Sequence, residues 1–236
     1  MRCFVLKEKV FRSVVINFII AFVVLGVFGI TYLSVDTPVR ANPDGAISRG
    51  NDNSKVSLMF DVYSGTQYID DILRVLDASK VSATFFVGGS WVANNEETLQ
   101  RISQYGHEIG NQGYFNQDHS TLSAQRNREE IVATHRLVQA MINISMTNFA
   151  PPSGTFNKHT ISEASNLGYN TIMWTVDTQD WKDDNVDMIV KRATDRLDGG
   201  DFILMHPTQS TVSALPKILD TIKDKGFGIV PIREVV

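Results

Sequence analysis

The stretch VSLMFD, residues 56–61, is the part of the sequence that decides the fold. Five uncharged residues, most of them apolar, run directly into an aspartate, and turn-forming residues stand before them. A short run of this composition is typical of a β-strand. The stretch therefore predicts a strand that carries a carboxylate, Asp61, at its C-terminal end.

Runs of the same kind recur along the chain and alternate with amphipathic stretches. Strands are expected at Val56–Asp61, Thr84–Val87, Asn148–Ala150, Thr171–Val176, Phe202–Met205 and Gly228–Ile232. Helices are expected at Tyr68–Ser79, Glu96–Tyr105, Ser123–Ile142, His159–Leu167, Val186–Leu197 and Val212–Lys225. This alternation predicts βαβ units and a parallel sheet of the α/β class. About seven βα units without a glycine-rich phosphate loop favour a distorted (β/α) barrel over a Rossmann sheet.

Polar or conformationally special residues follow several of these expected strands. They are Asp61, then Gln112–Asn116, Ala150–Gly154, Asp177–Trp181 and finally His206. In a (β/α) barrel the chemistry takes place where the strands end. The sequence therefore predicts one site, at the C-terminal mouth of the barrel.

The N-terminal region has the features of a membrane anchor. Val14–Leu33 contains no charged residue. The stretch is about as long as a helix that crosses a bilayer. Four basic residues and one acidic residue precede it, and this basic excess favours a cytoplasmic N-terminus. We expect a cytoplasmic tail (1–13), a transmembrane anchor (14–34), a flexible linker rich in Pro, Asn, Asp, Gly and Ser (35–54), and a folded extracytoplasmic domain (55–236). A cleaved signal peptide is the alternative.

The charge of the chain argues against a nucleic-acid-binding protein, and its cysteine content argues against a domain stabilised by disulfides. The chain has 22 basic and 26 acidic side chains. Four of the basic and one of the acidic side chains lie in residues 1–34, so the remainder of the chain has 18 basic and 25 acidic groups and a net charge of −7. Such a domain repels phosphate polymers, so nucleic acid is not an expected partner. Cys3 is the single cysteine, which rules out an intramolecular disulfide.

Five segments in order resemble the motifs of polysaccharide deacetylases, the NodB-homology or carbohydrate esterase family 4 proteins, and in particular the sporulation-associated branch. The segments are LMFDV, GHEIGNQGYFNQDHSTLS, FAPPSG, VDTQDW and LMH, and the resemblance covers about residues 55 to 236. It implies a catalytic base at Asp61 and a catalytic acid at His206. Asp180 and Trp181 match the fourth motif, and Leu204 matches an apolar residue of the acetyl pocket.

The resemblance also implies a divalent metal held by one Asp and two His, and here this sequence departs from the family. The three ligand positions fall on Val62, Gln112 and Asn116. Valine has no lone pair, and neutral amide oxygens are poor zinc ligands. The arginine that orients the base in the family falls on Ala150, and the usual aromatic of that motif falls on Ser153. No cofactor is therefore expected, and weak binding of zinc or cobalt at a site rebuilt from Asp61, His119 and His206 is the alternative.

Three functions remain open at this point. The first is a degenerate deacetylase, a pseudoenzyme that binds N-acetylated cell-wall glycan (peptidoglycan or chitin-like) or an envelope protein. The second is an active N-deacetylase, a hydrolase of carbon–nitrogen bonds other than peptide bonds, with an unusual metal site. The third is a non-catalytic scaffold tethered to the membrane. Trp181 suits stacking on a sugar ring as well as plain packing. The sequence does not indicate the oligomeric state.

Overall fold

We describe a computed structural model of the chain, in which residues 45–236 are placed. The expected tail (1–13), the anchor (14–34) and the first part of the linker (35–44) lie outside these described residues. Within residues 45–236, none of the helices has both the length and the apolar character that crossing a membrane requires.

The domain is built on one parallel sheet, as the alternating pattern predicted. Its strands are β1 (Lys55–Val62), β2 (Thr84–Val87), β3 (Glu108–Asn111), β4 (Asn148–Phe149), β5 (Asn170–Thr171), β6 (Val176–Asp177), β7 (Phe202–Met205) and β8 (Gly228–Ile229). Seven of them follow the order β5-β4-β3-β2-β1-β7-β6, and β8 pairs with the start of β1. The sheet curls into a partial (β/α) barrel, which confirms the predicted fold class.

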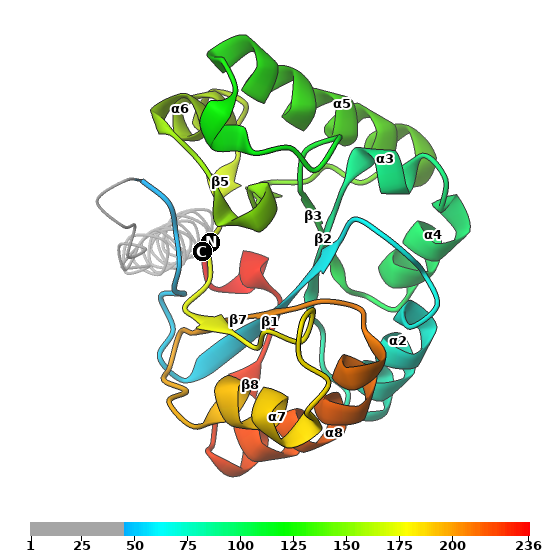
Figure 1. Cartoon of the computed structure of the whole chain (residues 1–236), viewed down its shortest axis with the longest axis vertical. Coiled ribbons are helices and arrows are strands. Elements are labelled where there is room, and N and C mark those ends of the chain that lie inside the picture. Colours follow the sequence, from blue (N-terminus) through cyan, green and yellow to red (C-terminus); the bar gives the residue numbers. More distant parts are fainter. Residues whose placement is uncertain (1–44) are drawn as a thin grey trace, which may run out of the picture. The chain divides into compact units, whose positions relative to one another are not determined.

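Helices cover the outside of the sheet (Figure 1). They are α2 (Ile69–Ala78), α3 (Gly89–Val92), α4 (Glu96–Gln104), α5 (Ala124–Ile142), α6 (Lys158–Asn166), α7 (Val186–Thr194) and α8 (Gln209–Asp224). Short 3-10 turns, η1 (His119–Thr121), η2 (Pro152–Gly154) and η3 (Ile232–Glu234), complete the described part. Several helices begin at a capping side chain: Ser123 accepts from the backbone N–H of Arg126, and Asn185 accepts from that of Met188.

Alternation along the strands divides the interior into two cores. On the helix side of the sheet, Phe60 and Phe85 stack with ring centroids 4.8 Å apart among the buried apolar faces of the helices. On the barrel side, Met59, Phe86 and Phe202 fill the space that the curled sheet encloses. Successive residues of a strand point to opposite faces, so the two cores take alternate residues of β1. Asp61 has the same parity as Met59 and therefore belongs to the barrel side.

A short segment before β1 closes the barrel. Ile47 donates its backbone N–H to the carbonyl of Thr171 at 2.8 Å and accepts from Met173 at 2.8 Å, and Gly50 donates to Gly200 at 2.8 Å. The side chains of Ala46 and Ile47 are buried. The segment thus bridges β5, at one end of the strand order, and the start of β7, the strand next to the other end. Residues 46–50 belong to the folded domain, although their polar neighbours made us expect linker there.

One predicted strand is divided in the structure. Thr171–Val176 was expected as a single strand, but β5 ends at Thr171 and β6 begins at Val176, at opposite ends of the strand order. The residues between them cross the open side of the barrel, where Ile172 pairs with Ile47. The last predicted strand is shorter than expected as well, because Pro231 has no backbone N–H to continue the pairing and η3 follows it.

Candidate functional site

The C-terminal ends of the strands meet around a cavity of about 230 Å³. Asp61 at the end of β1 and His206 after β7 face each other across it, and Leu204 lines the barrel side. Trp181, in the loop after β6, forms part of its wall and is 57% exposed. Ser153, at the position of the third motif's usual aromatic, lines the cavity as well. The structure therefore brings these five residues, all named from the sequence, together at the predicted end of the barrel.

Asp180 lies behind His206 and fixes its position. One oxygen of its carboxylate lies 2.9 Å from His206 Nδ1, and the other accepts from the His206 backbone N–H at 2.8 Å and from Thr211 Oγ1 at 2.5 Å. Burial lowers the pKa of His206, but the hydrogen bond and negative charge of Asp180, with Asp61 nearby, outweigh that effect and raise it. Because Nδ1 donates to Asp180, the other ring nitrogen, Nε2, remains for contact with a ligand.

Asp61 is almost completely buried. Desolvation raises the pKa of its carboxyl group to about 7, although the positive charge of His206 and a contact with Gln112 oppose the rise. Its Oδ1 atom has no hydrogen-bond partner in the part of the chain that the structure describes. In the family that the chain resembles, an arginine stands where this sequence has Ala150, a buried residue of the barrel-side core. His206 is therefore the cation that offsets the charge of Asp61.

The three residues at the family's metal-ligand positions are not arranged as a metal site. Val62 is fully buried in the helix-side core and has no donor atom. Gln112 is buried, and among residues 45–236 neither the oxygen nor the nitrogen of its side-chain amide has a hydrogen-bond partner. Asn116 is exposed and has a left-handed backbone conformation with φ of +53°. None of the three lines the mouth cavity. The side chains present at these three positions therefore do not fit a divalent metal.

The alternative site of Asp61, His119 and His206 is not assembled either. His119 is buried, its Nδ1 atom lies 2.7 Å from Asn127 Oδ1, and its ring packs against Phe149. Within residues 45–236, no three His, Cys, Asp or Glu side chains are grouped so as to hold a metal. His119 instead joins the mouth loop to α5, and its burial lowers its pKa.

Three residues at the mouth escaped the sequence analysis or received no role there. Tyr63 lines the cavity, is 42% exposed and meets the His206 ring edge to face, with centroids 6.4 Å apart. It lies two residues after Asp61, so the strand period could have indicated that it faces the same side. Trp174 and Asp177 also line the cavity. Trp174 lies within a stretch predicted to be a strand, and Asp177 was named only as the first residue of the polar stretch Asp177–Trp181, without a role.

Comparison with known proteins agrees with this arrangement. Residues 48–172 match the family model described as polysaccharide deacetylase. An uncharacterised Bacillus subtilis protein, YlxY, is 37% identical over 191 residues, which cover 80% of this chain and 60% of YlxY. The peptidoglycan-N-acetylglucosamine deacetylase PgdA of Listeria monocytogenes is 31% identical over 193 residues, or 80% of this chain and 40% of PgdA. The chain thus spans less than two thirds of the length of these relatives.

The similar solved structures include a protein described as a pseudoenzyme and a mutant of it. The wild-type structure of a Bacillus anthracis protein described as a CE4 family pseudoenzyme has a TM-score of 0.79 and 35% identity, covering 82% of this chain and 69% of that one. A mutant of that protein, described as having restored enzymatic activity, also has a TM-score of 0.79 and 35% identity, with coverage of 82% and 72%.

Proposed function

We propose, since the chain belongs to the polysaccharide deacetylase family, that its domain binds N-acetylated cell-wall glycan without metal-dependent deacetylation. One observation carries the proposal. The walls of the mouth cavity persist, with Asp61, His206 and Trp181 in place, while Val62 and Gln112 occupy positions where the family has metal ligands. A metal in such a site polarises the amide carbonyl and acidifies a water molecule. Without that group, the remaining side chains can hold a sugar but lack the main source of catalysis.

The shape and composition of the mouth support a carbohydrate ligand. Trp181 and Tyr63 are large aromatic side chains that remain exposed at the rim. Aromatic rings that present one open face at a cavity suit the apolar face of a sugar ring. The carboxyl of Asp61 and the ring of His206 supply hydrogen-bonding groups below them, and Leu204 supplies an apolar wall for an acetyl group.

The proposed ligand class follows from the relatives. PgdA of Listeria monocytogenes is a peptidoglycan-N-acetylglucosamine deacetylase by name. For this chain we propose only the class of ligand, an N-acetylated glycan that is either peptidoglycan or a chitin-like polymer. We further propose that residues 14–34 hold the domain on the outer side of the cell membrane. Protease treatment of intact cells tests this placement, because an extracytoplasmic domain is degraded and a cytoplasmic domain is protected.

Glycan titration tests the main proposal. The purified domain is titrated with N-acetylglucosamine oligomers and with peptidoglycan fragments, and the Trp181→Ala variant is compared with wild type. Loss of one stacking aromatic should weaken binding about tenfold. Tyr105→Ala is the matched control, because Tyr105 is 44% exposed and does not line the mouth cavity. Failure of wild type to bind any of these glycans would contradict the proposal and leave a scaffold as the remaining function.

An active deacetylase is the second candidate, favoured by the retained Asp180–His206 pair beside Asp61. It requires stoichiometric zinc or cobalt in the purified protein. It also requires acetate release from the same oligomers, abolished by Asp61→Asn. Protein that binds glycan but contains no metal and releases no acetate would exclude this candidate and support the non-catalytic function.

A further inference from the structure

The mouth cavity is surrounded by more negative than positive charge. Among the described residues that line it, Asp61 and Asp177 are acidic, His206 is the one side chain that can become a cation, and none is lysine or arginine. Behind the wall, Asp180 lies 2.9 Å from the His206 ring and matches the positive charge of that ring. At least one negative charge is therefore left over, even when Asp61 and His206 are both protonated.

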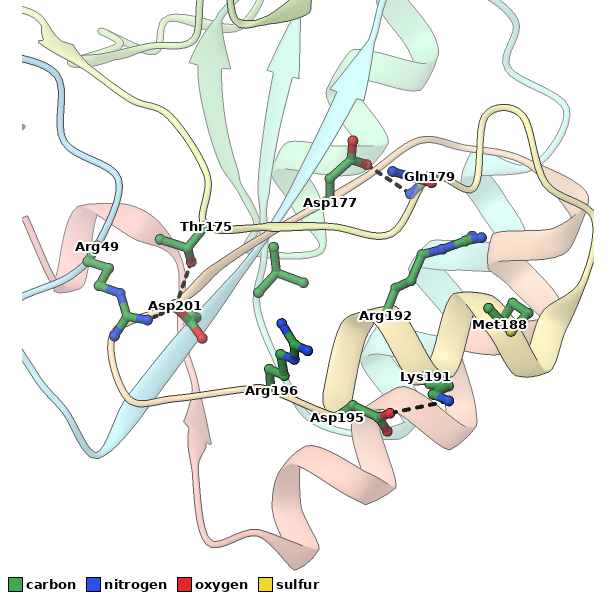
Figure 2. A pocket seen from close by; sticks show the side chains of 11 residues that line it. Arg49, Thr175, Asp177, Gln179, Met188, Lys191, Arg192, Asp195, Arg196 and Asp201 are labelled. Atoms are coloured by element: carbon green, nitrogen blue, oxygen red, sulfur yellow. Dashed lines mark hydrogen bonds and ion pairs between the residues drawn. The ribbon is translucent and has the colours of Figure 1, made fainter.

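Asp177 carries this remaining charge. Its carboxylate accepts a hydrogen bond from the backbone N–H of Gln179 at 2.8 Å and, within residues 45–236, takes part in no ion pair. In Figure 2 the carboxyl group points away from Arg196, which lines a second cavity on the other side of Asp177. The charge of Asp177 instead acts on Asp61 and His206, and it therefore belongs to the mouth.

Asp61 supplies a buried hydrogen-bond acceptor that the domain itself does not use. Its side chain lines the cavity and is only 4% exposed. Its Oδ1 atom has no hydrogen-bond partner among residues 45–236. Buried polar atoms in native proteins nearly always have a partner, so an unpaired oxygen beside a cavity indicates a donor that comes from a ligand.

Aromatic rings form much of the remaining wall. Tyr63, Trp174 and Trp181 all line the cavity. The faces of such rings carry partial negative charge and attract cations. Trp181 already has one such contact, because the Nζ atom of Lys182, a residue outside the cavity lining, lies 5.2 Å from its ring centroid. Carboxylates and aromatic faces together favour a positively charged hydrogen-bond donor over a neutral amide.

We infer that the mouth cavity binds a sugar whose nitrogen is a free, positively charged amino group, an inference that rests on the proposed function. An ammonium group offers three N–H donors and a charge, whereas an N-acetyl group offers one N–H and no charge. The amine can donate to Asp61 Oδ1 and lie beside the Asp177 carboxylate, with the sugar ring against Trp181. The glycan as a whole remains N-acetylated, and one of its sugars has lost the acetyl group. Deacetylation by another protein must therefore precede binding.

Oligomers that differ at a single nitrogen test the inference. The full chain, purified in detergent, is titrated with the N-acetylglucosamine tetramer and with four further tetramers, each of which has a free amine on a different one of its sugars. At least one of the four should bind about tenfold more tightly than the fully acetylated tetramer. Added salt should reduce this difference, because the preference depends on charge.

Two variants identify the group responsible. Asp177→Asn removes the charge but keeps an oxygen that can accept from the Gln179 N–H, so the local backbone is preserved. This variant should still bind the acetylated tetramer and should lose the preference for the amine. Asp220→Asn is the control, because it removes one negative charge from an exposed position that does not line the cavity. It should keep the preference.

The outcomes separate this inference from the function on which it rests. If wild type binds all five tetramers equally, or if Asp177→Asn keeps the preference for the amine, the amine site is excluded while glycan binding stands. If Asp220→Asn loses the preference as fully as Asp177→Asn does, the preference comes from the overall charge of the chain and the inference is wrong. If no tetramer binds, the proposed function fails and the inference fails with it.

Discussion

At the residue scale, Asp61 combines burial with a weakly compensated charge. Its carboxyl group is desolvated, and among the causes that oppose the resulting rise in pKa the positive charge of His206 is the largest. The mouth of the barrel therefore contains a carboxyl group that takes up a proton near neutral pH. A group of this kind donates a hydrogen bond when protonated and accepts one when ionised, which suits it to contact an amide substituent.

We predict that the free energy of unfolding falls as pH rises from about 4 to about 7 because of Asp61. The pKa of its carboxyl is raised from 3.8 to about 7 on folding, so the folded state binds a proton in this range more readily than the unfolded state. At about 1.4 kcal/mol for each unit of pKa, the loss is at most roughly 4 kcal/mol. Urea unfolding at pH 5 and pH 8 checks this, with a smaller loss in Asp61→Asn. Asp220→Asn, at an exposed carboxylate, is the control and should behave as wild type.

Asp180 controls the protonation of the neighbouring histidine, which gives a second prediction at this scale. In Asp180→Asn the pKa of His206 should fall, because the hydrogen bond and charge that raise it are removed while burial remains. An NMR titration of the His206 ring measures the change. Asp177→Asn is the comparison and should produce a smaller shift, since Asp177 contributes last among the causes. A fall in Asp177→Asn as large as that in Asp180→Asn would contradict this assignment.

At the scale of elements, the segment of residues 46–50 is held by a buried ion pair. Arg49 lies 2.7 Å from Asp201, whose side chain is 1% exposed and also accepts from Thr175 Oγ1 at 2.6 Å. The pair ties the start of the domain to the turn before β7. Backbone hydrogen bonds from Ile47 then complete the closure of the barrel.

Removal of the arginine should destabilise the domain. In Arg49→Met the buried carboxylate of Asp201 loses its cation, which we expect to lower the free energy of unfolding by about 2 kcal/mol, less than for a fully buried pair because Arg49 is 30% exposed. Arg74→Met is the matched control, since Arg74 and Asp71 form an ion pair at the surface whose loss should cost less than about 1 kcal/mol. Equal urea midpoints for the two variants would show that the Arg49–Asp201 pair contributes no special stability.

The strands and helices themselves were largely predictable, and the exceptions have physical causes. Thr84–Val87 and Phe202–Met205 are strands with the expected bounds, because short buried runs carry a clear signal. The division of Thr171–Val176 was not predictable from local pattern, since it depends on pairing with Ile47, more than a hundred residues earlier. The segment of residues 46–50 escaped for a related reason: its apolar part is too short to stand out among Asn, Asp and Gly.

At the scale of the whole molecule, the barrel retains the arrangement of an enzyme, whereas the residues at the metal-ligand positions are those of a protein without the metal. The barrel places Asp61, His206, Asp180 and Trp181 together, as the sequence resemblance implied for an enzyme. The same barrel buries Val62 on the helix side and leaves Asn116 exposed on a left-handed turn. The first result was predictable from the resemblance of the motifs to those of the family. The burial of Val62 and the exposure of Asn116 were not predictable from the sequence, because they depend on how side chains pack around the mouth of the barrel.

These replaced positions yield the last prediction. In the variant Val62→Asp, Gln112→His, Asn116→His, one carboxylate and two imidazoles stand where the family holds its metal, and these are the donors that zinc prefers. We expect the variant to bind zinc where wild type does not, as measured by metal analysis after gel filtration. Acetate release should remain low, because Ala150 leaves Asp61 without an arginine to orient it. The variant should also unfold more easily, since Val62→Asp places a polar group in the helix-side core.

The single variant Val62→Asp separates a true metal site from adventitious binding. It carries the same destabilising change but lacks both imidazoles. It should therefore unfold at a lower temperature than wild type and bind no zinc. Zinc should restore stability to the triple variant alone, because a ligand that binds only the folded state raises the unfolding temperature. If the triple variant stays folded and still takes up no zinc, the mouth has lost the geometry of the site as well as its donors. A binding role would then remain for the cavity, and the barrel could not regain metal-dependent chemistry by restoring those three side chains.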